Sequence, residues 1–546
     1  MVFAQRRVDI ADQGVHVLRA SILLICAVMS VSCTAQTLKD KSFTFSEARL
    51  SALSDAGPPR RVFLITIAGL LSADFLNARG HIASERDNVR MPNLARLARE
   101  GAIGMQAHPP TPGAVYPSHA TLVTGLNPTQ HGIISDQALD QDGNRALPYW
   151  DNRLLKGMTL WDAAVGRGVL ALGWPTTNGA RIELVVPDGG PTDPATSWLE
   201  HMRNLSTPML MRELDAMALA AAEAAESKES DGGDEGERAE PVDWPSVVEK
   251  DSAFAELACR VVASERDPGL WLIRFDQTAS YQRTFGFGSV EVDEALGRVD
   301  AEIGRITACL EAADQLGDTA IFVTGDVAFQ PVHTRIDPNV ILGRNSLIGR
   351  DPRSSMGVRS WLALSMSNGR SAYIYARDAK NAIEARELLE EEATRNGGFE
   401  VVSAADLADA GADPQAWFGL AAKPGFFIGN GLARPASRPS GLRASAGTFP
   451  FLDVESSAVG FVAWGRGVRS LVRVPSMRLS DVAPTIATLL GLRLDETLAG
   501  EPLVGILRAA EPLPPPGPKR LGIDNDADVD RTLRELGGGR ELGRDQ

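Results

Sequence analysis

Two aspartates of the sequence stand where an open α/β sheet places its chemistry. Asp276 and Asp326 each follow a short apolar run of the kind found in buried parallel strands. Ligands and catalytic groups of such sheets gather beyond the carboxyl ends of the strands, and carboxylates there can hold a divalent cation. The first apolar run, 62–67, is followed by Ala68, which has no donor atom. The strand ends therefore offer two carboxylates and one position without a ligand atom.

Histidine, a common zinc ligand beside carboxylates, is scarce in the second half of the chain. The sequence has seven histidines, and none lies between 202 and 332 or after 333. They are His16, His81, His108, His119, His131, His201 and His333. Only His333 closely follows one of the two aspartates in the sequence.

Five further segments carry sequence motifs. They read MPNLARLAREGA at 91–102, YPSHATLVTGLNPTQHGI at 116–133, WPTTNGA at 174–180, FGFGSVEVDEALGRVDAEIG at 285–304 and SDVAPTIATLLGL at 480–492. Together with the order of the strand ends, they resemble the alkaline phosphatase superfamily, and within it the type I phosphodiesterases and nucleotide pyrophosphatases. The resemblance covers most of the chain from 60 to 507. It implies an α/β fold with a mainly parallel sheet covered by helices on both faces, and a bimetallic hydrolase.

The resemblance also implies which residue types belong at the catalytic positions. Two zinc-like ions on carboxylates and histidines would stabilise the attacking and leaving oxygens, and a threonine or serine alkoxide would attack. Ala68 stands in place of a metal-binding aspartate, and Val115 in place of the nucleophilic threonine. Valine has nearly the shape of threonine but no oxygen with which to attack. Asp136 stands near the position of an asparagine that contacts the phosphate.

Among the other metal positions, only the two aspartates agree with the resemblance. Asp276 and Asp326 match. The three histidine positions carry Ser280 (or Arg283 in an alternative alignment), Val327 and Ala446. We therefore predict no catalytic residue, no bound metal and no cofactor, with Asp276 and Asp326 as the ligands if a metal is kept.

These substitutions predict a pseudoenzyme with a binding or assembly role, whose ligand is an unidentified protein or small molecule. Two aspartates without a metal would repel each other or take up a proton. We expect Arg283 to turn inward and to pair with Asp276 or Asp326. The alternative is an active phosphoester hydrolase with one zinc ion on these aspartates and His333, and with water or Ser118 as the nucleophile.

Several residues near these positions have structural explanations. Ser118 is expected to cap a helix rather than to attack a substrate. His119 and His131 lie in segments that match the family, but the resemblance gives neither a metal-binding role, so both are expected to hydrogen-bond in turns or in the core. Three indole rings are expected to pack in the core, those of Trp150, Trp161 and Trp174.

Strand and helix patterns alternate along the chain. Short apolar runs predict strands at 62–67, 169–174, 270–275, 319–324, 372–375, 399–402 and 459–464. Helical periodicity predicts helices at 92–100, 160–165, 254–264, 290–313, 378–394 and 481–490. Asp378 is a predicted N-cap. This alternation independently favours a mainly parallel sheet with helices on both faces.

The first 35 residues have the composition of an export signal. Arginines precede the apolar run 20–32, which is too short to span a bilayer, and small residues follow it. Residues 1–35 are therefore predicted to be a signal peptide. The segment around Cys33 also resembles a bacterial lipobox, in which this cysteine would carry a lipid and tether the protein to a membrane. Both alternatives predict export, to the periplasm or as a membrane-anchored lipoprotein.

Composition predicts the other boundaries. Residues 36–59 form a polar lead-in to the phosphatase-like domain at 60–507. Residues 223–240 are strongly acidic and contain no apolar residue larger than alanine, which predicts a disordered insertion. The proline-rich and charged segment 508–546 predicts a flexible tail.

Net charge and cysteine content exclude other classes of protein. The net charge of −15 argues against a nucleic-acid partner, which would need a basic face. Four cysteines are too few for a disulfide scaffold. Outside the leader, Cys259 and Cys309 are expected either as two buried thiols or, in an exported protein, as one disulfide.

Overall fold

The computed structural model describes residues 57–77, 79–83, 89–139, 146–189, 196–229, 245–351, 357–494 and 497–508. The predicted signal peptide with Cys33, most of the polar lead-in, the larger part of the acidic insertion and nearly all of the tail lie outside these residues. Within the described ranges, no helix combines the length and the apolar character needed to cross a membrane.

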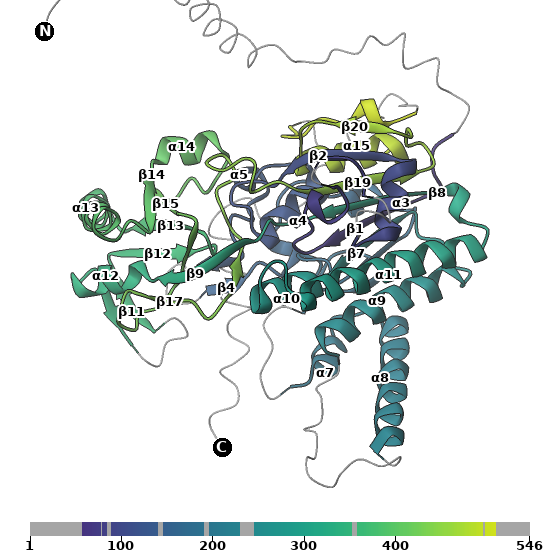
Figure 1. The fold of residues 1–546 in the computed structure, drawn as a ribbon, viewed down its shortest axis with the longest axis horizontal. Coiled ribbons are helices and arrows are strands. Elements are labelled where there is room, and N and C mark those ends of the chain that lie inside the picture. Colours follow the sequence, from purple (N-terminus) through teal and green to yellow (C-terminus); the bar gives the residue numbers. More distant parts are fainter. Residues whose placement is uncertain are drawn as a thin grey trace, which may run out of the picture. The chain divides into compact units, whose positions relative to one another are not determined.

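A large sheet forms the centre of the fold (Figure 1). In the described chain its nine strands have the order β20-β2-β19-β8-β1-β7-β5-β6, with β21 paired to β2. Their bounds are β1 Arg61–Ile67, β2 Ala102–His108, β5 Val169–Leu172, β6 Leu184–Val186, β7 Leu270–Phe275, β8 Thr319–Gly325, β19 Val459–Gly465, β20 Val472–Val474 and β21 Met477–Arg478. Strands β8, β1, β7, β5 and β6 run parallel, whereas β19 is antiparallel to both neighbours. The predicted mainly parallel sheet is therefore confirmed.

The register of the central strands brings three strand ends together. Strand β1 ends opposite the ends of both β7 and β8. The residues that follow, Ala68, Asp276 and Asp326, therefore start from one edge of the sheet although they lie far apart in the sequence. This edge holds the candidate site.

Helices cover both faces of the sheet because its strands are apolar on both sides. One face carries α3 Pro92–Glu100, α9 Val247–Val262 and α11 Val290–Ala312, and the other carries α4 Val115–Thr124, α6 Leu160–Ala163 and α15 Val482–Leu490. In β1, Phe63 and Ile65 belong to the core on the side of α3, α9 and α11. Val62 and Leu64 belong to the core on the side of α4, α6 and α15. Burial on both faces explains why the strands read as continuous apolar runs.

Smaller sheets lie outside the central one. An antiparallel sheet consists of β12 Ala363–Ser367, β13 Ser371–Ala376, β15 Phe418–Ala422 and β14 Phe399–Val402, in that order. A mixed sheet consists of β9 Gln330–Ile336, β16 Gly425–Ile428, β17 Ser437–Pro439 and β18 Ala444–Ser445, in which β16 runs parallel to β9. Two antiparallel pairs consist of β3 Gln137–Leu139 with β4 Ala146–Pro148 and of β10 Ile348–Arg350 with β11 Val358–Trp361. The strand–helix–strand pattern predicted at 372–402 therefore belongs to an antiparallel sheet with its own core, and not to the parallel one.

Of the remaining helices in the described residues, six were not predicted from the sequence. The remaining helices are α5 Pro128–His131, α7 Trp198–Met202, α8 Pro208–Glu229, α10 Gln277–Phe285, α12 Pro338–Arg344, α13 Ala379–Asn396 and α14 Ala404–Asp409, with 3₁₀ turns at Ser72–Asp74, Asn152–Leu154, Leu316–Asp318, Leu479–Asp481 and Val504–Ile506. Helix α8 runs into the segment predicted as a disordered insertion, because its alanine-rich sequence has high helix propensity.

Two expectations about the core have clear outcomes. Cys259 of α9 and Cys309 of α11 form a disulfide, with Cα atoms 5.5 Å apart, so the interpretation as two free thiols is wrong. The helices that carry them lie side by side across one face of the sheet (Figure 1). The three indole rings are buried as expected, those of Trp150, Trp161 and Trp174.

Removal of the predicted N-cap of α13 tests whether Asp378 stabilises the start of this helix. The Asp378 carboxylate accepts a hydrogen bond of 2.9 Å from the backbone N–H of Asn381. Asp378→Ala should lower the free energy of unfolding by about 1 kcal/mol, because that N–H loses its partner. Urea unfolding followed by circular dichroism measures the change. The control Glu387→Ala, on the exposed side of the same helix, should cost less than about 0.5 kcal/mol; equal losses would contradict the capping role.

Candidate functional site

An apolar cluster occupies the space beyond the ends of β1 and β8. It consists of Ala68, Ala279, Val327, Phe329 and Ala444, with Val115 and Ala446 packed against it. Four of these are positions at which the resemblance implies a metal ligand or the nucleophile: Ala68, Val115, Val327 and Ala446. The fold therefore brings these sequence positions together, but their side chains offer no lone pair to a metal and no oxygen for attack.

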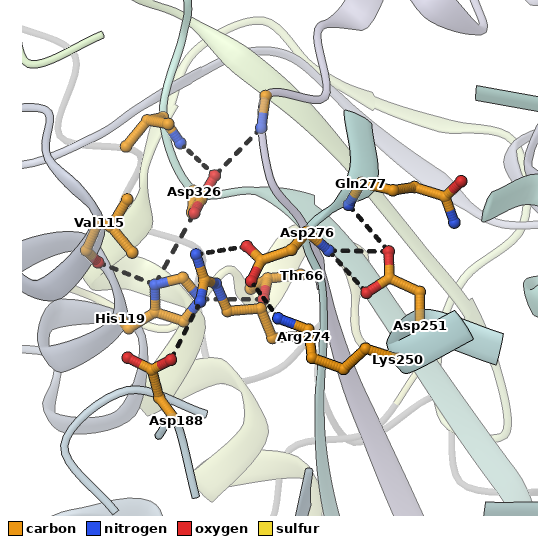
Figure 2. A network of polar contacts seen from close by, with 12 residues as sticks. Thr66, Val115, His119, Asp188, Lys250, Asp251, Arg274, Asp276, Gln277 and Asp326 are labelled. Atoms are coloured by element: carbon orange, nitrogen blue, oxygen red, sulfur yellow. Dashed lines mark hydrogen bonds and ion pairs between the residues drawn. The ribbon is translucent and has the colours of Figure 1, made fainter. Parts of the chain in front are cut away.

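Asp276 is held between two cations, as Figure 2 shows. The Arg274 Nη2 atom lies 2.5 Å from one carboxylate oxygen, and the Lys250 Nζ atom lies 2.9 Å from the other. Arg274 stands two residues earlier along β7, and strand alternation places it on the same side. Burial alone would raise the pKa of Asp276, but Arg274 and then Lys250 outweigh it and hold that pKa well below its usual range.

A second carboxylate fixes the backbone at Asp276. Asp251 accepts hydrogen bonds from the backbone N–H groups of Asp276, at 3.0 and 2.9 Å, and of Gln277, at 2.9 Å. These N–H groups belong to the start of α10, where a helix leaves its donors without partners and favours a negative charge. Burial raises the pKa of Asp251 to about 7, and the charge of Asp276 acts in the same direction.

Arg274 also links β7 to the start of α4. Its Nη1 atom lies 3.8 Å from Asp188, and Asp188 accepts a hydrogen bond of 2.5 Å from the Tyr116 hydroxyl. Tyr116 is the second residue of α4, directly after Val115. The same arginine thus balances Asp276 on one side and Asp188 on the other (Figure 2).

Asp326 accepts hydrogen bonds from backbone N–H groups and, in the described part of the structure, has no contact with a cationic side chain comparable to that of Asp276. One carboxylate oxygen accepts from Gly69 at 3.2 Å and from Val327 at 2.7 Å, while the other has no hydrogen-bond partner among the described residues. Burial raises the pKa of Asp326, and Arg274 opposes this only in part. The approach of Gly69 needs a glycine, because its φ is +83° and a Cβ would lie 2.3 Å from the Gln282 side chain.

The two histidines of this region make core hydrogen bonds, as expected. His119 donates from Nδ1 to the Val115 carbonyl at 2.8 Å and accepts at Nε2 from the Thr66 hydroxyl at 2.9 Å. Burial, with a smaller effect of the nearby arginine, lowers the pKa of His119 to about 3, so the ring is neutral although Nδ1 lies 3.9 Å from Asp326. His131 also hydrogen-bonds in the core: its Nδ1 accepts from the Ile133 backbone N–H at 3.1 Å, and its Nε2 lies 3.0 Å from the Thr121 hydroxyl.

A small cavity of ≈ 140 Å³ lies beside the apolar cluster. Its lining includes Val115, Val327, Ala446, Asp136, Arg283 and Asn368. Asp136 accepts a hydrogen bond of 2.9 Å from the backbone N–H of Tyr116. Burial raises the pKa of Asp136 to about 6, an effect that the Arg283 charge opposes. The cavity therefore combines an apolar side with four polar side chains, the fourth being Ser445.

The expected pairing of Arg283 with an aspartate is wrong. The cations in contact with Asp276 are Arg274 and Lys250, and among the described residues no ion pair joins Arg283 to either aspartate. Its guanidinium lies over the Phe329 ring, 4.9 Å from the centroid, at the edge of the cavity. At Asp276 the physical reason is that cations on β7 and α9 already occupy both carboxylate oxygens. One oxygen of Asp326 has no hydrogen-bond partner in the described part of the chain, but Arg283 stacks on Phe329 instead.

Three other candidate residues do not line the cavity. Ser118 is the fourth residue of α4, whose N-cap is Ala114, so the expected capping role is wrong; its hydroxyl is buried with no hydrogen-bond partner in the described structure. His333 is exposed on β9 and contacts the Thr334 hydroxyl at 2.8 Å. Ser280 lies one turn into α10.

A zinc pair does not fit the residues present. The apolar cluster takes four of the implied positions, and the two aspartates are engaged by cations and by backbone N–H groups. Over the described ranges, no three His, Cys, Asp or Glu side chains are grouped so that they could hold a metal ion.

Sequence analysis missed Arg274, Lys250 and Asn368. A signal existed for Arg274, because it is a charged residue inside the apolar run 270–275 and stands two positions before Asp276. Lys250, in the first turn of α9, and Asn368, between β12 and β13, carry no comparable local signal. Only the packing of distant segments brings them to the site.

Solved structures with this fold include ectonucleotide pyrophosphatase/phosphodiesterases. The human member 5 (ENPP5) gives a TM-score of 0.55 at 14% identity, covering 82% of this chain and 98% of that chain. The murine protein gives 0.53 at 16% identity, and an inactive variant of it in complex with AMP gives 0.53 at 15%; each covers 79% of this chain and 95% of the other. Identities this low show the fold alone, which is that of the alkaline phosphatase superfamily.

The family within that class follows from the sequence match. The model of the type I phosphodiesterase / nucleotide pyrophosphatase family matches residues 78–412, more than half of the chain. The chain therefore belongs to this family. A curated relative, bis(5'-adenosyl)-triphosphatase ENPP4 of Bos taurus, is 25% identical over 166 residues, or 28% of this chain. The match spans 33% of the length of that relative.

Removal of Arg274 tests the charge balance of Asp276. Arg274→Met should lower the free energy of unfolding by about 2–4 kcal/mol, because a buried carboxylate loses one of its two cations. The pKa of Asp276 in the folded protein lies below its value in the unfolded chain. The ion pair therefore contributes its full stabilisation above about pH 4, and this contribution decreases as the pH falls further. The difference between variant and native protein should therefore narrow below about pH 4, as measured by urea unfolding at several pH values.

The control for this variant is Arg266→Met. Arg266 forms an exposed ion pair with Glu183 at 2.8 Å, and its loss should cost less than about 1 kcal/mol. Adding Asp276→Leu and Lys250→Met to Arg274→Met should recover part of the loss, since Asp276 and both of its cations are then removed together. If Arg274→Met costs no more than Arg266→Met, the cation does not balance Asp276.

Proposed function

We propose that this chain is a catalytically inactive member of its family that uses the former active-site cleft for binding. The observation that carries the proposal is the apolar cluster at the positions of metal ligands and nucleophile. Val115 presents methyl groups where attack requires an oxygen, and Ala68, Val327 and Ala446 present no ligand atom.

The energetics of the family reaction support this proposal. Each metal ion in a bimetallic site supplies several kcal/mol of transition-state stabilisation, and the alkoxide is the reacting group itself. A murine relative is inactive when a single threonine is changed to alanine. In the present chain, no histidine lines the cavity among the described residues, so the side chain that most often activates a hydroxyl is missing there.

A binding role is supported by the polar side chains that remain. Asp136, Arg283 and Asn368 line the cavity although the catalytic groups are replaced. The ligand is a small molecule or a segment of a protein. The net charge of −15 disfavours a nucleic acid.

We also propose that the protein is exported, to the periplasm or as a lipoprotein tethered through Cys33. The disulfide between Cys259 and Cys309 supports this, because such bonds persist in oxidising compartments. The charged and apolar composition of residues 1–35 supports it independently.

Metal and activity measurements test the inactive site. After loading with zinc or manganese and desalting, the purified protein should retain far less than one ion per chain by elemental analysis, because too few ligands remain. It should also leave bis(4-nitrophenyl) phosphate and a diadenosine polyphosphate unhydrolysed, with an active type I phosphodiesterase as the positive control. Two bound ions with hydrolysis would contradict the proposal, and one ion with hydrolysis lost in Asp276→Ala and Asp326→Ala would establish the single-metal alternative.

Labelling of the N-terminal region tests the proposed export. Expressed in a bacterium with radiolabelled palmitate, the protein should take up label, and Cys33→Ala should not, because the thiol carries the lipid. Cys26→Ala is the matched control and should keep the label. An unlabelled protein with a free N-terminus near Gln36 would reject the lipid and favour simple cleavage, and retention of residues 1–35 in the cytoplasm would reject export.

A further inference from the structure

We propose that the cavity binds a small α-amino acid, with its carboxylate on Arg283 and Asn368 and its ammonium group on Asp136. The inference rests on the proposed function, because it requires a cleft without metal ions. It assigns a chemical class of ligand to that cleft.

The first observation is a pair of opposite charges that share the cavity without contact. Asp136 and Arg283 both line it, yet no ion pair joins them among the described residues. Arg283 rests over the Phe329 ring, which leaves the N–H groups at the rim of its plane able to bind a carboxylate. Asp136 is held in place by its hydrogen bond from the backbone of Tyr116. Two opposite charges held apart in this way fit the two ends of a zwitterion.

The second observation is a buried amide with no partner. Asn368 lines the cavity, is only 8% exposed, and has neither Nδ2 nor Oδ1 in a hydrogen bond within the described structure. A buried donor and acceptor that are both unpaired are costly and rare. Both atoms are buried, so the side chain must turn toward the cavity before Nδ2 donates to a carboxylate and Oδ1 accepts from an ammonium group.

The backbone around Asn368 holds this arrangement in place. Gly447 has a φ of +82°, and a Cβ there would lie 1.5 Å from the Asn368 carbonyl oxygen. The loop that carries Ala446 therefore packs directly against Asn368, with Arg370 N–H donating to the Ala446 carbonyl at 2.8 Å. The backbone positions of Asn368 and Ala446 are thus fixed relative to each other.

Size and charge select among ligands. A volume of ≈ 140 Å³ is close to that of an engineered cavity that binds benzene, and is well below that of an ordinary pocket for larger ligands. A mononucleotide is therefore too large to be enclosed. The carboxylate of Asp136 opposes a phosphate dianion, whereas the apolar surfaces of Val115 and Ala446 accept a short aliphatic side chain.

Isothermal titration calorimetry on the full chain after treatment with EDTA tests the inference. The probes are L-alanine and L-valine, and at least one should bind with a Kd of about 10 μM to 1 mM. Propionate lacks the ammonium group and ethylamine lacks the carboxylate, so each should bind at least about tenfold more weakly than L-alanine. Inorganic phosphate and AMP are titrated in the same way.

Variants assign the contacts. Asp136→Asn, Arg283→Met and Asn368→Leu should each weaken amino-acid binding by about tenfold or more, because each removes one partner of the zwitterion. Arg443→Met is the matched control: this arginine is exposed and does not line the cavity, and its loss should leave the Kd unchanged. Thermal unfolding of each variant shows whether the fold is retained.

Three results would overturn the inference. They are the absence of heat with both amino acids, equal affinity for propionate and L-alanine, and tighter binding of phosphate or AMP that Arg283→Met abolishes. A different result would contradict the proposed function, namely bound metal ions together with hydrolysis of the phosphodiester probes. A flat titration on metal-free, inactive protein rejects only the amino-acid ligand.

Discussion

A carboxylate taken out of water needs a positive charge, hydrogen-bond donors or a proton, and this requirement shapes the site. Asp276 leaves the end of a buried strand where the family reaction would use metal ions. Here Arg274 and Lys250 carry the positive charge, and Asp188 and Asp251 surround them. These partners lie on several elements, so the charge balance of one residue ties β7 to α9, α10 and the start of α4.

Asp326 meets the same requirement in another way. Its negative charge is met by two backbone N–H groups and by a raised pKa, beside a histidine that burial keeps neutral. Around it, Ala68, Val327 and other apolar side chains form a hydrophobic cluster. The region beyond the strand ends is thus divided into an ionic part, an apolar part and a small cavity lined by Asp136 and Asn368. The lining of the cavity includes the polar side chains of Asp136, Arg283 and Asn368.

The scaffold persists because it makes weaker demands on the sequence than the chemistry does. The central sheet needs apolar side chains on both faces, and many sequences satisfy that, which is why the fold is shared at identities of 14–16%. A bimetallic site needs particular donor atoms at each position, and a single alanine or valine removes one. Membership of the family therefore describes the fold of this chain and leaves its function to the residues in the site.

The sequence by itself determined the local features. The bounds of β7, α3 and β14, the N-cap Asp378 and the residues at the strand ends all follow from apolar periodicity, capping chemistry and chain order. The tertiary structure alone decided that Lys250 also balances Asp276, that β13 and β14 belong to a separate antiparallel sheet, and that Asn368 lines the cavity. These outcomes depend on contacts between segments far apart in the chain. Arg274 and Lys250, and not Arg283, pair with Asp276 because the fold places these two cations within contact distance of its carboxylate.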